Sequence, residues 1–155
     1  MDAPTIRAYL SGLLTETTRS FVKDVEALSE AQLHASPGGV ARSPMAFIAE
    51  CAGFSRRVAA HLRGEDAPVT SDASGDAAIA AMTKESAVAA IRGSSAELLA
   101  AWRELPEADM ARTVPLWGEE MPIPVLIGLV SQHLAYHDGQ LNMIQAMGGD
   151  GTIHW

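Results

Sequence analysis

The stretch SQHLAYHDGQL, residues 131–141, carries the residues most able to do chemistry, because it places two histidines four positions apart in an otherwise helical run. Side chains at positions i and i+4 of an α-helix lie on one face, one turn apart. His133 and His137 therefore point toward the same region of space. The zinc-binding helices that carry HExxH use the same spacing.

The two histidines fall within the apolar face of the predicted helix, together with Gln140. Ser131, Asp138 and Asn142 fall on the opposite side. Two core histidines without a common partner would each need a separate polar group in the core, which is costly. Since histidine is the commonest metal ligand, the pair favours a metal site over two separately satisfied core histidines.

Glu50, on another predicted helix, is the candidate for a third ligand. It lies at the edge of an apolar face, and none of its neighbours three or four positions away is basic, so no pair of that spacing explains it. A single glutamate more often reaches solvent from such a boundary, but beside two facing histidines we favour a ligand. A His₂Glu set occurs in catalytic zinc sites and in non-haem iron sites, and the pattern does not choose between them.

Cys51 is the rival third ligand, because it lies next to Glu50 and centrally on the same apolar face. A buried cysteine is more often a small hydrophobic residue than a ligand. The two residues lie about 100° apart around their helix, so they cannot easily serve the same ion.

Four long helical segments must position these residues, with predicted bounds at residues 4–28, 44–62, 84–105 and 124–147. Ser43 and Thr83 look like N-caps, and Gly64 and the Gly148–Gly149 pair look like terminators. A short helix is predicted near 76–82. Two β-leaning runs flank residues 117–120 and predict a small hairpin. We therefore expect one all-α domain over residues 1–155, a four-helix bundle with long crossover connections and a hairpin before the last helix.

Composition narrows the classes of partner. The net charge is −8, and the 11 lysines and arginines are scattered, which argues against binding nucleic acid or an anionic membrane. The longest apolar run, MPIPVLIGLV, is too short to span a bilayer. The N-terminus lacks the layout of a signal peptide, and the single cysteine allows no intrachain disulfide. We expect a cytoplasmic protein.

Three segments together resemble a known family: SPMAFIAECA, a hairpin containing Trp-Gly, and SQHLAYHDGQLNMIQAMG. The chain is similar to the DinB/YfiT-like superfamily of four-helix metalloproteins. The resemblance implies a site with one ligand from the second long helix and an i, i+4 pair from the last, which here is His133 and His137. Its first ligand usually lies seven residues after the serine that opens the helix. Counting from Ser43 gives Glu50, where histidine is usual.

We expect a metal-dependent enzyme that acts on a small molecule, and the resemblance implies thiol transfer, thiol-linked isomerisation or hydrolysis as its reaction. The implied cofactor is a divalent ion, zinc before nickel, iron or manganese, with a low-molecular-weight thiol as co-substrate. Gln140, Tyr136 and Trp117 are expected to support the ligands or contact the substrate. The alternative is a non-catalytic ligand-binding or stress-associated bundle, compatible with a homodimer, whose metal site is structural or vestigial. An open coordination position in an accessible pocket would favour the enzyme.

Overall fold

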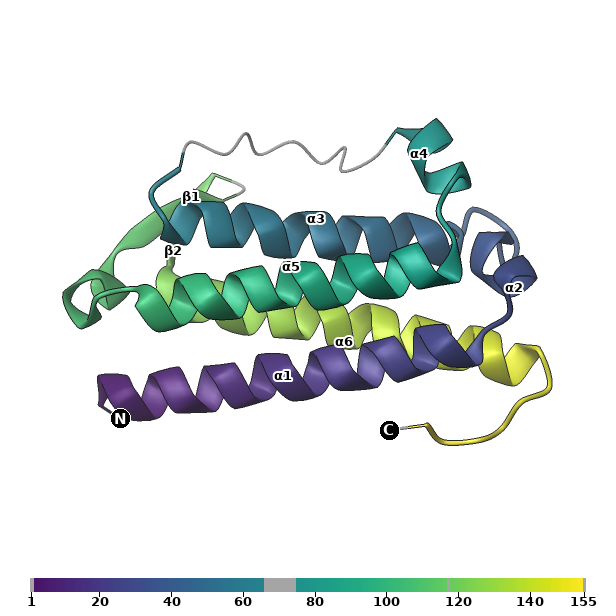
Figure 1. Ribbon diagram of the computed structural model, residues 1–155, viewed down its shortest axis with the longest axis horizontal. Coiled ribbons are helices and arrows are strands. Elements are labelled where there is room, and N and C mark those ends of the chain that lie inside the picture. The colour runs from purple at the N-terminus through teal and green to yellow at the C-terminus, as the bar shows by residue number, and fades with distance from the viewer. Residues whose placement is uncertain (1, 66–74, 117, 155) are drawn as a thin grey trace.

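The computed structural model describes residues 2–65, 75–116 and 118–154. Its long helices are α1 (Ala3–Ala27), α3 (Pro44–Leu62), α5 (Lys84–Glu104) and α6 (Ile123–Met147). The shorter elements are α2 (Glu30–His34), α4 (Asp76–Ala80), the 3₁₀ helix η1 (Glu107–Ala111), and strands β1 (Thr113–Leu116) and β2 (Glu119–Pro122). The expected all-α four-helix bundle with a small hairpin is confirmed (Figure 1).

Helices α3 and α1 each pack against both α5 and α6. Figure 1 shows α1 and α6 running in one direction and α3 and α5 in the other. The end of α3 and the start of α5 therefore lie at opposite ends of the bundle, and the connection between them is a long crossover. The other two long connections join antiparallel helices and return at the same end of the bundle.

Local signals account for the helix bounds. The Thr83 hydroxyl accepts a hydrogen bond from the Ser86 backbone N–H, and the Ser86 hydroxyl accepts one from the Thr83 backbone N–H. Ser43 is the N-cap residue of α3 as predicted, although its side chain makes no capping bond. Beyond the end of α3, Gly64 has φ +75°, a left-handed conformation that suits glycine.

Helix α2 was not predicted, although the sequence contains its signal. Ser29 and Gln32 form a capping box, in which the Ser29 hydroxyl accepts from the Gln32 N–H and the Gln32 side chain accepts from the Ser29 N–H. The spacing of serine and glutamine could have placed a helix start there.

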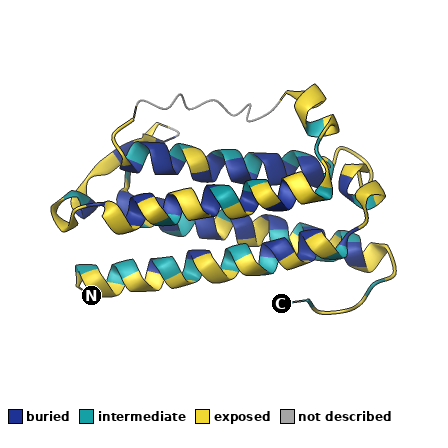
Figure 2. Ribbon diagram, in the orientation of Figure 1, coloured by how far each residue is buried: buried dark blue, intermediate teal, exposed yellow. Residues whose placement is uncertain are grey.

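Apolar side chains fill the centre of the bundle, as the dark blue inward faces in Figure 2 show. Leu14, Phe21, Trp102 and Ile127 have no exposed surface. Burying one side chain of this kind stabilises a fold by about 1.5–3 kcal/mol. In the described part of the chain, no helix has the length and apolar character needed to cross a membrane.

The hairpin turn is shorter than expected. Leu116 pairs with Glu119, so two residues connect the strands, whereas the sequence suggested a four-residue turn that included Glu119 and Glu120. Gly118 has φ +82°, which suits a two-residue turn. Trp117, which we expected near the site, lies outside the described residues.

The side of α6 opposite the histidines is not a solvent face. Ser131 is 1% exposed, and the Asn142 amide donates a hydrogen bond to the Asp24 carboxylate of α1. Since α6 packs against α1 on one side and α3 on another, both sides of the helix contact protein. Its polar residues therefore do not mark an exposed face.

Candidate metal centre

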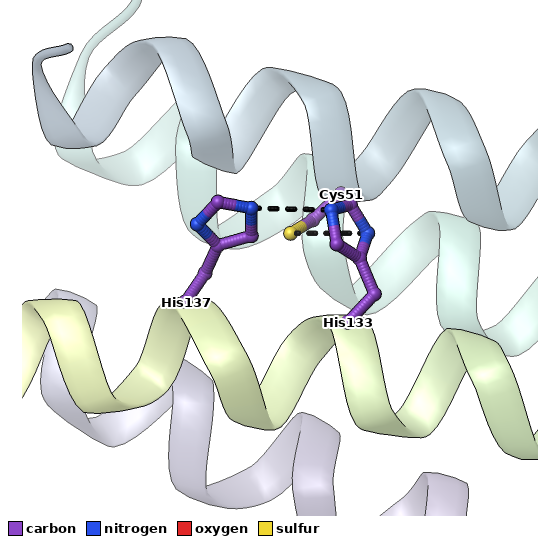
Figure 3. A group of neighbouring side chains, drawn as sticks. All are labelled: Cys51, His133 and His137. Carbon is purple, nitrogen blue, oxygen red and sulfur yellow. Dashed lines mark hydrogen bonds between the residues drawn. The ribbon is translucent and has the colours of Figure 1, made fainter.

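The candidate centre lies between α3, which carries Glu50 and Cys51, and α6, which carries His133 and His137. The contact between these two helices is the least extensive of the four main helix–helix interfaces. Figure 3 shows both imidazoles rising from α6 toward α3. The structure therefore brings together the three ligands expected from the sequence, and also the rival Cys51.

Nε2 of His133 lies close to two other potential ligand atoms. Nε2 of His133 lies 3.1 Å from Nε2 of His137 and 3.2 Å from Oε1 of Glu50. Ligand atoms 2.0–2.2 Å from one tetrahedral zinc ion would lie about 3.3–3.6 Å apart. Both separations from His133 Nε2 are within a few tenths of an ångström of that range. Glu50 is not part of the group of potential ligand atoms that, among the described residues, all lie within 4.8 Å of one another, which consists of Cys51, His133 and His137.

Gln140 sets the protonation of His137. Its Oε1 lies 2.7 Å from Nδ1 of His137, and because a carbonyl oxygen only accepts, Nδ1 must carry the proton. The Nε2 atom of the neutral ring then has a free lone pair that points at His133. Metal-binding histidines are usually held by such a bond to the second ring nitrogen. Gln140 therefore supports the ligands, as the sequence suggested.

The Cys51 sulfur lies near both imidazoles but contacts a different nitrogen of His133 than Glu50 does. Its Sγ is 4.0 Å from Nδ1 of His133, whereas Glu50 and His137 both contact Nε2 (Figure 3 draws the cysteine and the two histidines). Cys51, His133 and His137 do form a group whose potential ligand atoms all lie within 4.8 Å of one another. The thiol contact is with the His133 nitrogen that does not face Glu50.

Electrostatics separates the two candidate third ligands. Burial raises the pKa of the Cys51 thiol far above its ordinary value, with the negative charge of Glu50 as a smaller contribution. Burial also opposes ionisation of Glu50, but the hydrogen bond and positive charge of Arg42 outweigh it, and the pKa of Glu50 is lowered. The carboxylate is thus ionised at neutral pH, whereas the thiol holds its proton.

Both histidines are neutral at pH 7. Burial is the largest cause that lowers the pKa of His133 and of His137 below the ordinary value of 6.5. The charge of Glu50 raises the pKa of His133, and the Gln140 bond raises that of His137, without reversing the shift. Neutral imidazole is the form that binds metal.

Arg42 is the residue of the site that the sequence reasoning missed. Its guanidinium donates to Oε2 of Glu50 from the loop that precedes α3. This loop is held by the Ser36 hydroxyl, which donates to the Ala41 carbonyl over 2.7 Å, and it turns through Gly39 at φ +58°. A partner eight positions away across a loop has no periodic signal, so the search at helical spacings could not find it.

Aromatic rings hold the imidazoles in place. Phe47 stacks on His137 with ring centroids 4.8 Å apart and an interplanar angle of 9°. Tyr136 contacts His137 edge-on at 4.9 Å, and Phe54 contacts His133 edge-on at 5.4 Å. Tyr136 is 63% exposed, so it covers the outer side of the site.

A pocket of about 390 Å³ opens beside His137. Its walls come from the loop before α3 and from α6, and Arg42, Phe47, Gln140 and Met143 are among the residues that line it. A volume near 400 Å³ is in the range of small-molecule sites. Of the candidate ligands only His137 lines this pocket, and it is 3% exposed, so the pocket ends at the edge of the centre.

Comparison with known proteins places the chain in a family. A family model described as the DinB superfamily matches residues 13–141. The chain belongs to the DinB superfamily. No curated protein matches it.

Solved structures share this DinB fold at low sequence identity. A DinB-like protein from Bacillus subtilis is 14% identical with a TM-score of 0.68, and the match covers 92% of this chain and 94% of that one. A DinB-like protein from Bacillus cereus is 17% identical with a TM-score of 0.63, and the match covers 87% of each chain. A histidine-to-alanine variant of a mycothiol-dependent maleylpyruvate isomerase is 18% identical with a TM-score of 0.66, and the match covers 87% of this chain and 60% of the isomerase.

Proposed function

We propose that this DinB-superfamily protein binds one divalent metal ion through Glu50, His133 and His137 and is a metal-dependent enzyme acting on a small molecule. The observation that carries the proposal is the approach of Oε1 of Glu50 and Nε2 of His137 to Nε2 of His133, at 3.2 and 3.1 Å. The carboxylate is ionised and both imidazoles are neutral. The proton on Nε2 of His133, which donates to Glu50, must move to Nδ1 for Nε2 to bind the metal.

The surrounding residues supply positioning and access. A divalent ion at this site would polarise a substrate or lower the pKa of a thiol or water. Gln140 holds the lone pair of His137 Nε2 toward the centre, Phe47 fixes the plane of that ring, and the pocket beside His137 admits a small molecule. The reaction we propose is thiol transfer, thiol-linked isomerisation or hydrolysis, in keeping with the fold shared with a mycothiol-dependent isomerase.

The donor set constrains the metal. Imidazole suits zinc, nickel and iron, whereas a carboxylate also suits harder ions such as manganese. Two imidazoles with one carboxylate match a catalytic zinc set, so we propose zinc first and nickel, iron and manganese as competitors. A thiol co-substrate, a cytoplasmic location and a homodimer stay predictions.

Elemental analysis of protein purified without chelator or added metal tests the proposal. We expect about one divalent ion per chain, and less than a tenth of that in His133→Ala, which removes one of three protein ligands. His61→Ala, at the end of α3, is the matched control and should keep the metal. Full metal content in His133→Ala would contradict the assignment. Unfolding temperature should fall only modestly, because the bundle core is otherwise apolar.

One observation favours the alternative of a non-catalytic bundle. The Arg42–Glu50 ion pair already neutralises the Glu50 carboxylate, so the centre is electrostatically satisfied without a metal. If the ion is absent at stoichiometric zinc concentrations in the wild-type protein, the bundle is a ligand-binding protein with a vestigial site. Zinc binding together with turnover of a thiol-linked substrate, lost on chelation and recovered on zinc addition, would establish the enzyme.

A further inference from the structure

The pocket beside His137 gathers much of the exposed apolar surface of the protein. Among the described residues seven large hydrophobic side chains are exposed, and four of them line this pocket: Val40, Tyr136, Met143 and Met147. Met143 and Met147 are 66% and 64% exposed. Adjacent exposed apolar side chains that form a patch are typical of a ligand-binding groove. The flexible thioether side chains of the two methionines adapt to ligands of varied shape.

The polarity of the pocket changes along α6. Tyr136, Gln140, Met143 and Met147 follow one another at three- and four-residue steps, so they form one stripe on the helix. Polar groups of His137 and Gln140 lie at the end near the candidate centre, and the two methionines lie one to two turns away. A ligand in this pocket would have a polar end at the centre and an apolar body along the methionines.

Among the described residues, the charged side chain that lines the pocket is Arg42, which also pairs with Glu50 outside the lining. The described lining contains no aspartate or glutamate. A guanidinium has five N–H donors arranged to match a carboxylate, and the Glu50 contact uses the Nη1 side of the group. Donors on the rest of the group are therefore available to a ligand.

We propose that the pocket binds a small amphipathic carboxylate, with its acid group on Arg42 and its apolar chain or ring along Met143 and Met147. This inference rests on the proposed function in one respect: the bound carboxylate is a substrate only if the centre is catalytic. Binding itself needs no metal. The pocket would hold such a molecule with its polar end beside His137.

Calorimetric titration with three eight-carbon probes tests the proposal. Octanoate, octan-1-ol and octylammonium have the same chain and differ in charge, so the comparison isolates the acid group. Each probe is titrated into chelator-treated and into zinc-loaded protein. We expect octanoate to bind the chelator-treated protein at one site, at least tenfold more tightly than either other probe. Equal affinities, or tightest binding of octylammonium, would overturn the proposal.

Two substitutions separate the two halves of the pocket. Arg42→Gln should remove the tenfold preference for octanoate over octanol. Met143→Gln should weaken the binding of both probes several-fold. Arg56→Gln is the control for the first, because Arg56 is also half-exposed and pairs with Glu97 on α5. Val125→Gln is the control for the second, as an exposed apolar residue of α6 outside this pocket. Both controls should match the wild-type protein, and a preference that survives Arg42→Gln would refute the role of Arg42.

The metal proposal and the carboxylate proposal fail in different ways. If the wild-type protein binds no zinc but still prefers octanoate, the metal proposal fails and the carboxylate proposal holds. If the protein binds stoichiometric zinc but shows no preference for octanoate, whether chelator-treated or zinc-loaded, the metal proposal holds and the carboxylate proposal fails. Unfolding temperatures of the variants, measured alongside, show whether a lost preference comes from the pocket or from unfolding.

Discussion

Nδ1 of His137 donates a 2.7 Å hydrogen bond to Oε1 of Gln140, one turn further along α6. The bond fixes which nitrogen of the ring carries the proton, and leaves the lone pair of Nε2 facing His133. Gln140 thereby orients a candidate metal ligand through a hydrogen bond to its second ring nitrogen.

Gln140→Leu should weaken zinc binding about 10–100-fold, the usual effect of removing such a support. Gln140→Glu keeps an acceptor at the same place and should bind zinc close to the wild-type level. Competition with a chelator of known affinity measures both variants. Wild-type zinc affinity in Gln140→Leu would show that this hydrogen bond does not contribute to metal binding.

The choice of third ligand can be decided by adjacent substitutions. Glu50→Gln keeps the shape but removes the charge, so we expect loss of most zinc affinity. Cys51→Ser should leave binding nearly unchanged, because its sulfur faces the other nitrogen of His133. Glu50→His should restore binding, since it recreates the three-histidine set usual in the family. Loss of zinc from Cys51→Ser with retention in Glu50→Gln would assign the site to Cys51.

The pH dependence of zinc affinity gives an independent test. With Glu50 as ligand, the carboxylate is ionised and both imidazoles are neutral at pH 7, so zinc affinity should be flat between pH 7 and 9. It should fall only where the pH reaches the pKa values of the two histidines, which burial lowers below 6.5. With Cys51 as ligand, binding would release the thiol proton, and affinity would rise about tenfold per pH unit between pH 7 and 9. A buffer that does not bind zinc is required.

A carboxyl pair between α1 and α6 should make the stability of the metal-free protein depend on pH. Burial, with the hydrogen bond and charge of Asp24 in addition, raises the pKa of Asp138 to about 7. In the unfolded chain an aspartate has a pKa of about 3.9. Between these values the folded state holds the extra proton, so this group's contribution to the free energy of unfolding falls as pH rises from about 4 to 7 and is constant above.

Asp138→Asn should remove this contribution, and urea unfolding at several pH values in the presence of chelator measures it. The difference between variant and wild type is the quantity to follow, because the histidines contribute an opposite slope: their lowered pKa values cost stability as pH falls below 6.5. Asp76→Asn, on the exposed face of α4, is the control and should track the wild type. Wild-type and Asp138→Asn curves that run parallel from pH 4 to 8 would exclude the effect.

Helix positions and the histidine pair could be read from the sequence, because both depend on interactions within a few residues. The capping role of Thr83, the proline at the start of α3 and the glycine after its end act locally, and the predicted bounds differ from the observed ones by one residue at most for the long helices. The i, i+4 spacing of His133 and His137 likewise follows from the geometry of one helix. The amphipathic pattern was less informative, because α6 contacts α1 on the side where Asp138 and Asn142 lie.

Only the tertiary structure decided what surrounds the histidines. The rotation of α3 against α6 places Glu50 on Nε2 of His133 and Cys51 on Nδ1, a difference of one ring nitrogen that no spacing encodes. The path of the loop before α3 brings Arg42 to Glu50 and forms a wall of the pocket. These arrangements depend on packing between segments far apart in the chain and on loop conformation, whereas periodicity reports only on the single helix in which it occurs.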